Sequence, residues 1–111
     1  MQVTVDIHAG ATAVLHLTGQ LDALSAPYVR NELANTVAGG HSRLVVDLAK
    51  VGFVDSSGLG SLISGLKAAR VAGGDLRLAQ PSTQVSTVLT LTMLERVLRS
   101  YPTVADALVG Y

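Results

Sequence analysis

The chain has no cysteine and no tryptophan, and only one phenylalanine and three tyrosines among its 111 residues. Without cysteine there are no disulfide bonds, thiolate metal sites or cysteine nucleophiles, which fits a reducing compartment. The apolar fraction is nevertheless 49%, mostly aliphatic. A chain of this size buries roughly two-thirds of its unfolded surface on folding, so it can be stable without disulfide bonds. We therefore expect one domain covering residues 1–111.

Charge is sparse and balanced, with eight basic and eight acidic residues. Because binding to nucleic acid needs a basic stripe, a net charge of zero argues against DNA or RNA as the main partner. There is also no polybasic segment for a membrane surface and no basic, apolar N-terminal signal. No apolar run reaches the roughly 20 residues that span a bilayer. These absences predict a soluble, cytoplasmic protein that does not bind membranes.

Motifs of catalysis and cofactor binding are missing too. The chain has no Gly-x-x-x-x-Gly-Lys-Ser/Thr loop, no Gly-x-Gly-x-x-Gly after its first strand and no Gly-x-Ser-x-Gly elbow. His8 and His16 could lie near each other on a first hairpin, and His41 falls in a loop, but no spacing typical of a metal site joins them. No histidine is placed to activate a serine. We therefore expect that the protein is not an enzyme and that it binds neither a cofactor nor a metal.

Hydrophobic periodicity predicts alternating strands and helices. The expected strands cover residues 2–8, 13–18, 43–48, 76–79 and 97–99. Helices are expected after Ser25, at Ser56 and Ser57, after Ser82 and after Thr103, with stops at the glycine pairs 39–40 and 73–74. The order ββαβαβαβα predicts an α/β fold: a mixed, mostly parallel open sheet of four to six strands, with helices mainly on one face.

One helix start stands out because it carries the run Asp55-Ser56-Ser57-Gly58 directly after a strand. The simplest interpretation is helix capping by one of the two serines. The other serine would then be exposed beside free backbone N–H groups, where phosphate chemistry is favoured. Gly58 and Gly60 would leave the surroundings open to a close partner.

The same region reads Phe53-Val54-Asp55-Ser56-Ser57-Gly58-Leu59-Gly60, and it resembles the phosphorylation-site motif of the anti-sigma factor antagonists. These are stand-alone STAS domain proteins of the bacterial sporulation and stress-response type. The loop Leu17-Thr18-Gly19-Gln20-Leu21-Asp22 resembles the family's Leu-Thr-Gly-Glu-Leu-Asp loop. Similar likenesses occur in the central strand at 44–48 and in the Gly-Gly turn before Leu76, so the resemblance covers essentially the whole chain.

The resemblance implies a partner-switching protein. In that family the unmodified antagonist binds an anti-sigma factor, itself a serine kinase, and so frees the sigma factor. The kinase then phosphorylates the serine after the motif aspartate, which is Ser56 here, and a PP2C-type phosphatase restores the active form. Ser57 would then be the capping residue. The resemblance implies a partner-binding surface at Asp22, Ser25, Asp55, Ser56, Ser57, Gly58 and Leu59.

Gln20 departs from the family pattern, because it stands where the family often has glutamate and so removes a charge near the expected interface. An alternative within the same fold is a scaffold or sensor that is not phosphorylated and that binds a nucleotide, lipid or transport partner. The retained serine favours the antagonist. A phosphoryl group adds about −1.5 to −2 charge at pH 7, enough to act on a partner without changing the fold.

Overall fold

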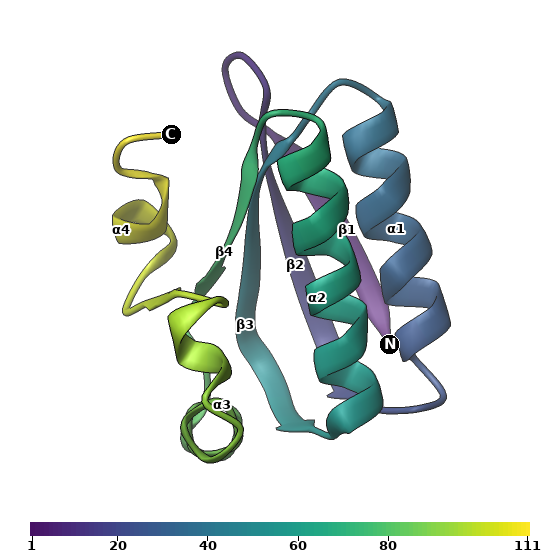
Figure 1. The fold of residues 1–111 in the computed structure, drawn as a ribbon, viewed down its shortest axis with the longest axis vertical. Coiled ribbons are helices and arrows are strands. Elements are labelled where there is room, and N and C mark those ends of the chain that lie inside the picture. The colour runs from purple at the N-terminus through teal and green to yellow at the C-terminus, as the bar shows by residue number, and fades with distance from the viewer.

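The computed structural model describes all residues 1–111, and its centre is a five-stranded sheet (Figure 1). The strands are β1 (Gln2–Ile7), β2 (Thr12–Leu21), β3 (Arg43–Val54), β4 (Asp75–Ala79) and β5 (Ser100–Tyr101), in the spatial order β1-β2-β3-β4-β5. β1 runs antiparallel to β2, and every other neighbouring pair is parallel. The predicted mostly parallel sheet with an antiparallel edge is confirmed.

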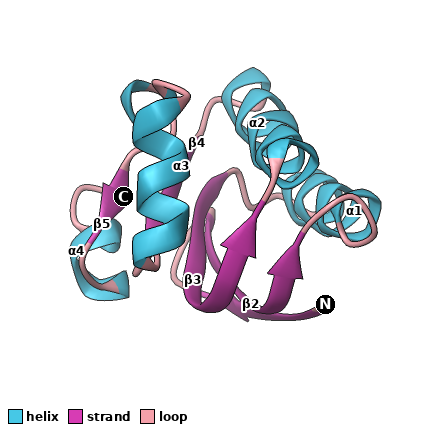
Figure 2. Cartoon of the chain, turned by 90° about the horizontal axis from the view of Figure 1, so that it is seen from below, coloured by secondary structure: helices cyan, strands magenta, loops and turns pink.

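Helices connect the parallel strands. They are α1 (Ala26–Ala38), α2 (Ser56–Val71), α3 (Thr83–Leu91) and α4 (Val104–Leu108), with a short 3-10 helix η1 (Leu94–Arg96) after α3. Figures 1 and 2 show α1 and α2 side by side on one face of the sheet. None of the helices combines the length and the apolar character that a membrane span requires.

The main core lies between the sheet and the helices α1, α2 and α3, and it contains 20 buried residues. Leu44, Val46 and Leu48 of β3 point into it, whereas Val45 points to the opposite face. There Val45 packs in a small cluster with Ala107 of α4. The centre of β3 is therefore buried on both faces, as its continuous apolar run predicts.

Three strand boundaries were predicted wrongly. β2 extends to Leu21, beyond the predicted end at residue 18. β3 extends to Val54, beyond the predicted end at residue 48, because pairing with β2 continues through register shifts near Thr18 and Gly19. The last strand is Ser100–Tyr101 rather than residues 97–99. Leu98 is fully buried, so its apolar character reflects core packing before the strand begins.

The predicted helix ends agree better with the structure. α1 and α2 stop just before the two glycine pairs. Ser82 caps α3 by accepting a hydrogen bond from the Val85 N–H, and Thr103 caps α4 by accepting one from the Asp106 N–H. Both caps match the sequence prediction.

Candidate functional site

Two loops meet where the parallel strands β2 and β3 end. Leu21 pairs with Val54 in the sheet, and the Asp55 N–H donates to the Leu21 carbonyl at 3.2 Å. Figure 2 shows the carboxyl ends of these strands next to each other, each leading into its helix. Asp22 and the Asp55-Ser56-Ser57 run, which are far apart in sequence, therefore lie at the same edge of the sheet.

Asp55, not a serine, is the N-cap of α2. Its backbone is extended, and its Oδ1 accepts a hydrogen bond from the Gly58 N–H at 2.9 Å. The prediction that Ser57 caps the helix was therefore wrong. Ser56 and Ser57 are instead the first two residues of α2, and both are exposed. Because Asp55 performs the cap, neither hydroxyl is needed to start the helix.

Gly58 has a packing role, in contrast to the open approach that its sequence suggested. The residue is buried, and a Cβ at this position would lie 2.0 Å from the Leu21 carbonyl oxygen. Only glycine lets the first turn of α2 pack this closely against the end of β2. Gly60 is exposed, and a Cβ there would meet nothing within 4 Å, so that position does stay open.

Leu59 lies in the main core and is only 4% exposed. Its side chain therefore does not belong to a partner-binding surface, contrary to the prediction. The helical period places it on the face of α2 that packs on the sheet, together with Leu62. Its role is to anchor the first turn, which holds Ser56 and Ser57 outward.

Ser25 is also buried, at 8% exposure. Its Oγ donates to the Gln20 carbonyl at 2.7 Å and accepts from the Asp22 N–H at 3.0 Å. It occupies the N-cap position of α1, but its side chain makes no cap hydrogen bond. Ser25 therefore ties the loop back to β2 and is not itself an exposed contact residue.

Asp22 is half-buried, and its carboxylate orders the same loop. Oδ1 accepts hydrogen bonds from the N–H groups of Leu24 and Ser25, both at 3.1 Å. Leu24, two residues after Asp22 in the same loop, is 93% exposed. A hollow of about 420 Å³ lies beside this loop, lined in part by Gln20, Asp22 and Leu24.

Gln84 of α3 holds the other side of the site, and sequence reasoning missed it. The Val54 N–H donates to Gln84 Oε1 at 2.9 Å, and Gln84 Nε2 donates to the Val54 carbonyl at 3.2 Å. The side-chain amide thus pairs with the end of β3 as a further strand would. No sequence motif marks such a glutamine, although its place in the first turn of a helix that follows β4 is a weak signal.

A second polar group, also missed, spans three strands on the face opposite α1 and α2. His16 Nδ1 lies 2.7 Å from Asp47 Oδ2, and His16 Nε2 lies 2.9 Å from Asp6 Oδ2. Burial lowers the pKa of His16, but the hydrogen bonds and negative charges of Asp47 and Asp6 outweigh that effect and raise it above 6.5. His8 is not beside His16, because His16 pairs with Thr4.

The comparison with protein families gives a clear match. The family model described as the STAS domain matches residues 2–107 of the chain.

Among curated proteins, the anti-sigma-B factor antagonist of Bacillus subtilis is 27% identical over 99 residues, covering 88% of this chain and 90% of that protein. Two Thermotoga proteins, named as candidate anti-sigma factor antagonists, are each 33% identical over 69 residues. Those alignments cover 62% of this chain and 61% of each Thermotoga protein, so the match spans less than two-thirds of their length.

Solved structures agree in fold. An anti-sigma factor antagonist from Mycobacterium paratuberculosis superposes with a TM-score of 0.85 at 28% identity, covering 96% of this chain and 90% of that one. The unphosphorylated form of the anti-sigma factor antagonist SpoIIAA has a TM-score of 0.81 at 21% identity, with 96% and 92% coverage.

Proposed function

The chain belongs to the STAS domain family, and from that premise we propose that it is an anti-sigma factor antagonist controlled by phosphorylation of Ser56. Its unmodified form binds an anti-sigma factor serine kinase in the cytoplasm and thereby frees a sigma factor. Phosphorylation ends the binding, and a PP2C-type phosphatase restores it. The names of curated relatives as anti-sigma factor antagonists support this proposal.

The exposed hydroxyl of Ser56 is the observation that carries the proposal. Ser56 is the first residue of α2, and Asp55 already caps that helix. The Ser56 side chain is therefore not engaged in starting the helix, and a kinase reaches it from solvent. Phosphoryl transfer breaks the bond between the γ-phosphorus of ATP and the oxygen that bridges it to the β-phosphorus. The γ-phosphorus forms an ester bond with Ser56 Oγ, and ADP leaves. The hydroxyl proton of Ser56 passes to a base of the kinase.

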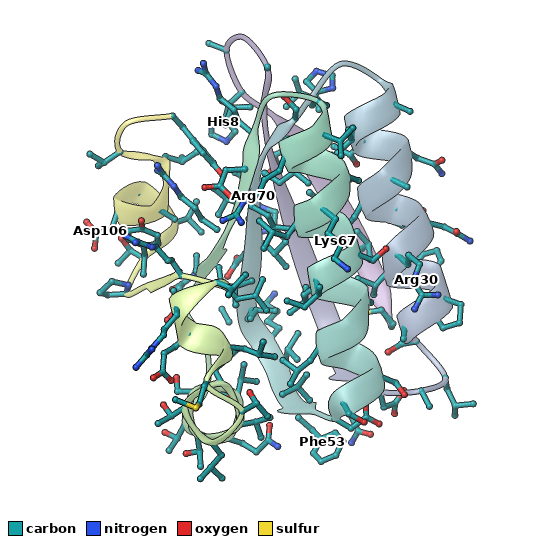
Figure 3. All side chains as sticks on the ribbon, in the orientation of Figure 1. His8, Arg30, Phe53, Lys67, Arg70 and Asp106 are labelled. Carbon is teal, nitrogen blue, oxygen red and sulfur yellow. The ribbon has the colours of Figure 1, made fainter.

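The surface around Ser56 is suited to a protein partner. Exposed apolar side chains lie on both sides of this edge: Leu24, in the loop after β2, is 93% exposed, and Phe53, near the end of β3, is 42% exposed. Figure 3 shows Phe53 at the end of β3, beside the start of α2. Apolar anchors beside polar loop atoms are typical of binding surfaces. We assign the partner-binding surface to Asp22, Leu24, Phe53, Asp55, Ser56 and Ser57.

Charge explains how a modification on this surface would act as a switch. A phosphoryl group brings about −1.5 to −2 charge at pH 7, next to the Asp55 carboxylate. Two neighbouring negative groups are costly to desolvate in an interface, and a loss of about 1.4 kcal/mol already weakens binding tenfold. The first turn of a helix tolerates negative charge, so the fold itself is retained.

The chain has no catalytic task in this scheme. The Ser56 hydroxyl has no histidine or other general base hydrogen-bonded to it, so it serves as a phosphoacceptor and not as a nucleophile activated within the chain. We expect no hydrolysis of ATP or phosphoesters by the purified protein.

The test is incubation with ATP and the serine kinases of the anti-sigma type from the same organism, followed by peptide mass spectrometry. Wild type and Ser57→Ala should gain one phosphate on Ser56, and Ser56→Ala should gain none. Ser57→Ala is a matched control, because Ser57 is the adjacent exposed residue of the same helical turn. Phosphate on Ser57, Ser25 or Ser82 alone would contradict the assignment. A chain that no such kinase modifies would favour the scaffold or sensor alternative.

A further inference from the structure

A small pocket lies at the outer edge of β4, and the Ser56 switch does not use it. β5 pairs only with Leu78 and Ala79, so the first half of β4 has no strand neighbour on that side. The last turn of α2 and the segment before β5 flank this uncovered edge and enclose a cavity of about 220 Å³. A cavity below the roughly 300 Å³ of a drug-sized ligand site suits an ion or a single small group.

The lining of this pocket is basic, although the chain as a whole is neutral. It includes Arg70 from α2, Arg77 from β4 and Arg99 from the segment before β5, with Asp75 as the one acidic residue. Three arginines against one aspartate give a formal charge of +2. Three different elements thus each contribute an arginine to the lining, and the excess of positive charge favours an anion in this pocket.

The guanidinium of Arg77 is held in place by α4 and the residues that follow it. Its Nη1 donates to the carbonyl oxygens of Ala107 at 2.9 Å and Val109 at 2.6 Å. The guanidinium carbon lies 3.9 Å from the centroid of the Tyr111 ring and 5.7 Å from that of Tyr101. Its Nε and Nη2 donate to no protein acceptor, so they are left as ordered donors for a ligand.

Asp75 shows that the pocket accommodates a carboxylate oxygen. Its Oδ1 accepts hydrogen bonds from the Leu76 N–H at 2.9 Å and from Arg70 Nε at 3.3 Å. This pairing compensates only Arg70. Neither Arg77 nor Arg99 forms a salt bridge with a carboxylate of the chain.

We propose that this β4-edge pocket, formed by Arg70, Arg77 and Arg99, binds the phosphate group of a small molecule. The planar guanidinium fork matches phosphate oxygens in two-point hydrogen bonding, which favours phosphate over a monovalent anion such as chloride. The ligand is either free inorganic phosphate or a phosphomonoester whose remaining part extends into solvent.

The experiment titrates the full-length protein with inorganic phosphate at constant ionic strength, following amide shifts by NMR and heat by calorimetry. Wild type should saturate with a Kd below about 1 mM, with the largest shifts at residues 70, 75–77 and 97–101. Arg99→Gln should weaken binding at least tenfold without loss of fold, because the side chain is exposed and makes no hydrogen bond. Arg70→Gln should weaken binding in the same direction.

Arg30→Gln is the matched control, because Arg30 is an exposed arginine on α1, on the other side of α2 from Arg70 (Figure 3). It should bind phosphate within twofold of wild type. A parallel titration with adenosine monophosphate and with adenosine separates the two sources of ligand: tighter binding of the monophosphate than of free phosphate indicates a phosphomonoester. Binding that does not saturate, equal losses in Arg30→Gln and Arg99→Gln, or shifts confined to Ser56 and Ser57 would overturn the proposal.

Discussion

At the scale of single residues, Ser56 and its neighbour Ser57 differ in what they are expected to do, although both are exposed at the same helix start. Ser56→Glu should weaken binding to the anti-sigma partner at least tenfold, or about 1.4 kcal/mol, because it places a fixed charge beside Asp55. A carboxylate has only about half the charge of a phosphoserine, so the loss is a lower bound. Ser56→Ala should bind within a few-fold of wild type. Calorimetry against the partner measures both.

The control for this prediction is Ser57→Glu, which adds the same charge one residue further along α2. Circular dichroism should show all three variants folded, since negative side chains are favourable in the first turn of a helix. A folded Ser56→Glu protein that binds like wild type would show that charge at this position is not the switch.

Gln84 is the second residue whose contribution is measurable. Gln84→Ala removes both hydrogen bonds to the backbone of Val54 and leaves its N–H without a partner. The expected loss is about 1–3 kcal/mol of unfolding free energy, together with faster hydrogen exchange at the Val54 amide. Urea denaturation of Thr87→Ala, an exposed position on the same helix, should give a change near zero. Unchanged exchange at Val54 in Gln84→Ala would argue against the pairing.

At the scale of elements, the contact between α2 and the end of β2 depends on Gly58. Gly58→Ala forces a Cβ against the Leu21 carbonyl, at 2.0 Å in the present backbone. The helix must shift, which we expect to cost about 1–3 kcal/mol of unfolding free energy and to lower partner binding. Gly60→Ala adds the same methyl two residues later, where nothing lies within 4 Å. It should stabilise the helix by about 0.5–1 kcal/mol. The midpoint temperature of thermal unfolding should therefore fall in Gly58→Ala and rise in Gly60→Ala.

The helix starts also show what sequence could and could not predict. Ser82 and Thr103 were predicted at helix starts because each precedes an apolar-periodic run, and each does accept a cap hydrogen bond. In Asp55-Ser56-Ser57, three good capping residues stand in a row, so local preference does not choose among them. The choice comes from a distant contact, since the Asp55 N–H pairs with the Leu21 carbonyl and keeps that residue extended.

At the scale of the whole molecule, the order of strands and helices followed from hydrophobic periods, because each element buries one regular face. The length of β3 could not be predicted from these periods, since Lys50 and Gly52 interrupt the apolar pattern while irregular pairing with β2 continues. The two segments of the candidate site, at Asp22 and Ser56, were predictable from sequence, and the structure places both at the same edge of the sheet. The burial of Leu59 follows from the helical period of α2. The burial of Ser25 was not predictable, because it depends on how the loop before α1 packs against β2.

The His16 cluster joins β1, β2 and β3, and it predicts how stability depends on pH. Protonated His16 donates to Asp6 and Asp47 together, whereas a neutral imidazole has one N–H. Asp47 also accepts a hydrogen bond from Gln80 Nε2 at 3.0 Å, and Lys50 lines the surface pocket that contains His16 and Asp47. Because folding raises the pKa of His16 above 6.5, its stabilisation is complete below that pH and is lost as pH rises through the raised value.

We therefore expect the unfolding free energy of wild type to fall as the pH rises above 6.5, and His16→Gln to reduce this slope. The effect should be modest, because 36% of the imidazole side chain is exposed and water screens the pairs. His8→Gln, at an exposed histidine outside the cluster, should keep the wild-type slope. Urea titrations at several pH values decide the matter, and an unchanged slope in His16→Gln would contradict the prediction.

The spatial order of the strands, β1-β2-β3-β4-β5, is also their order along the chain. Each strand therefore joins the sheet next to the one made just before it, and no later segment has to insert between two earlier ones. Because loop closure between successive elements loses less entropy than closure between distant ones, this arrangement favours rapid folding. The growing sheet can then extend in the direction of synthesis from the hairpin of β1 and β2. The edge of β4 beside Asp75 is where that growth stops short, since β5 is too brief to cover it.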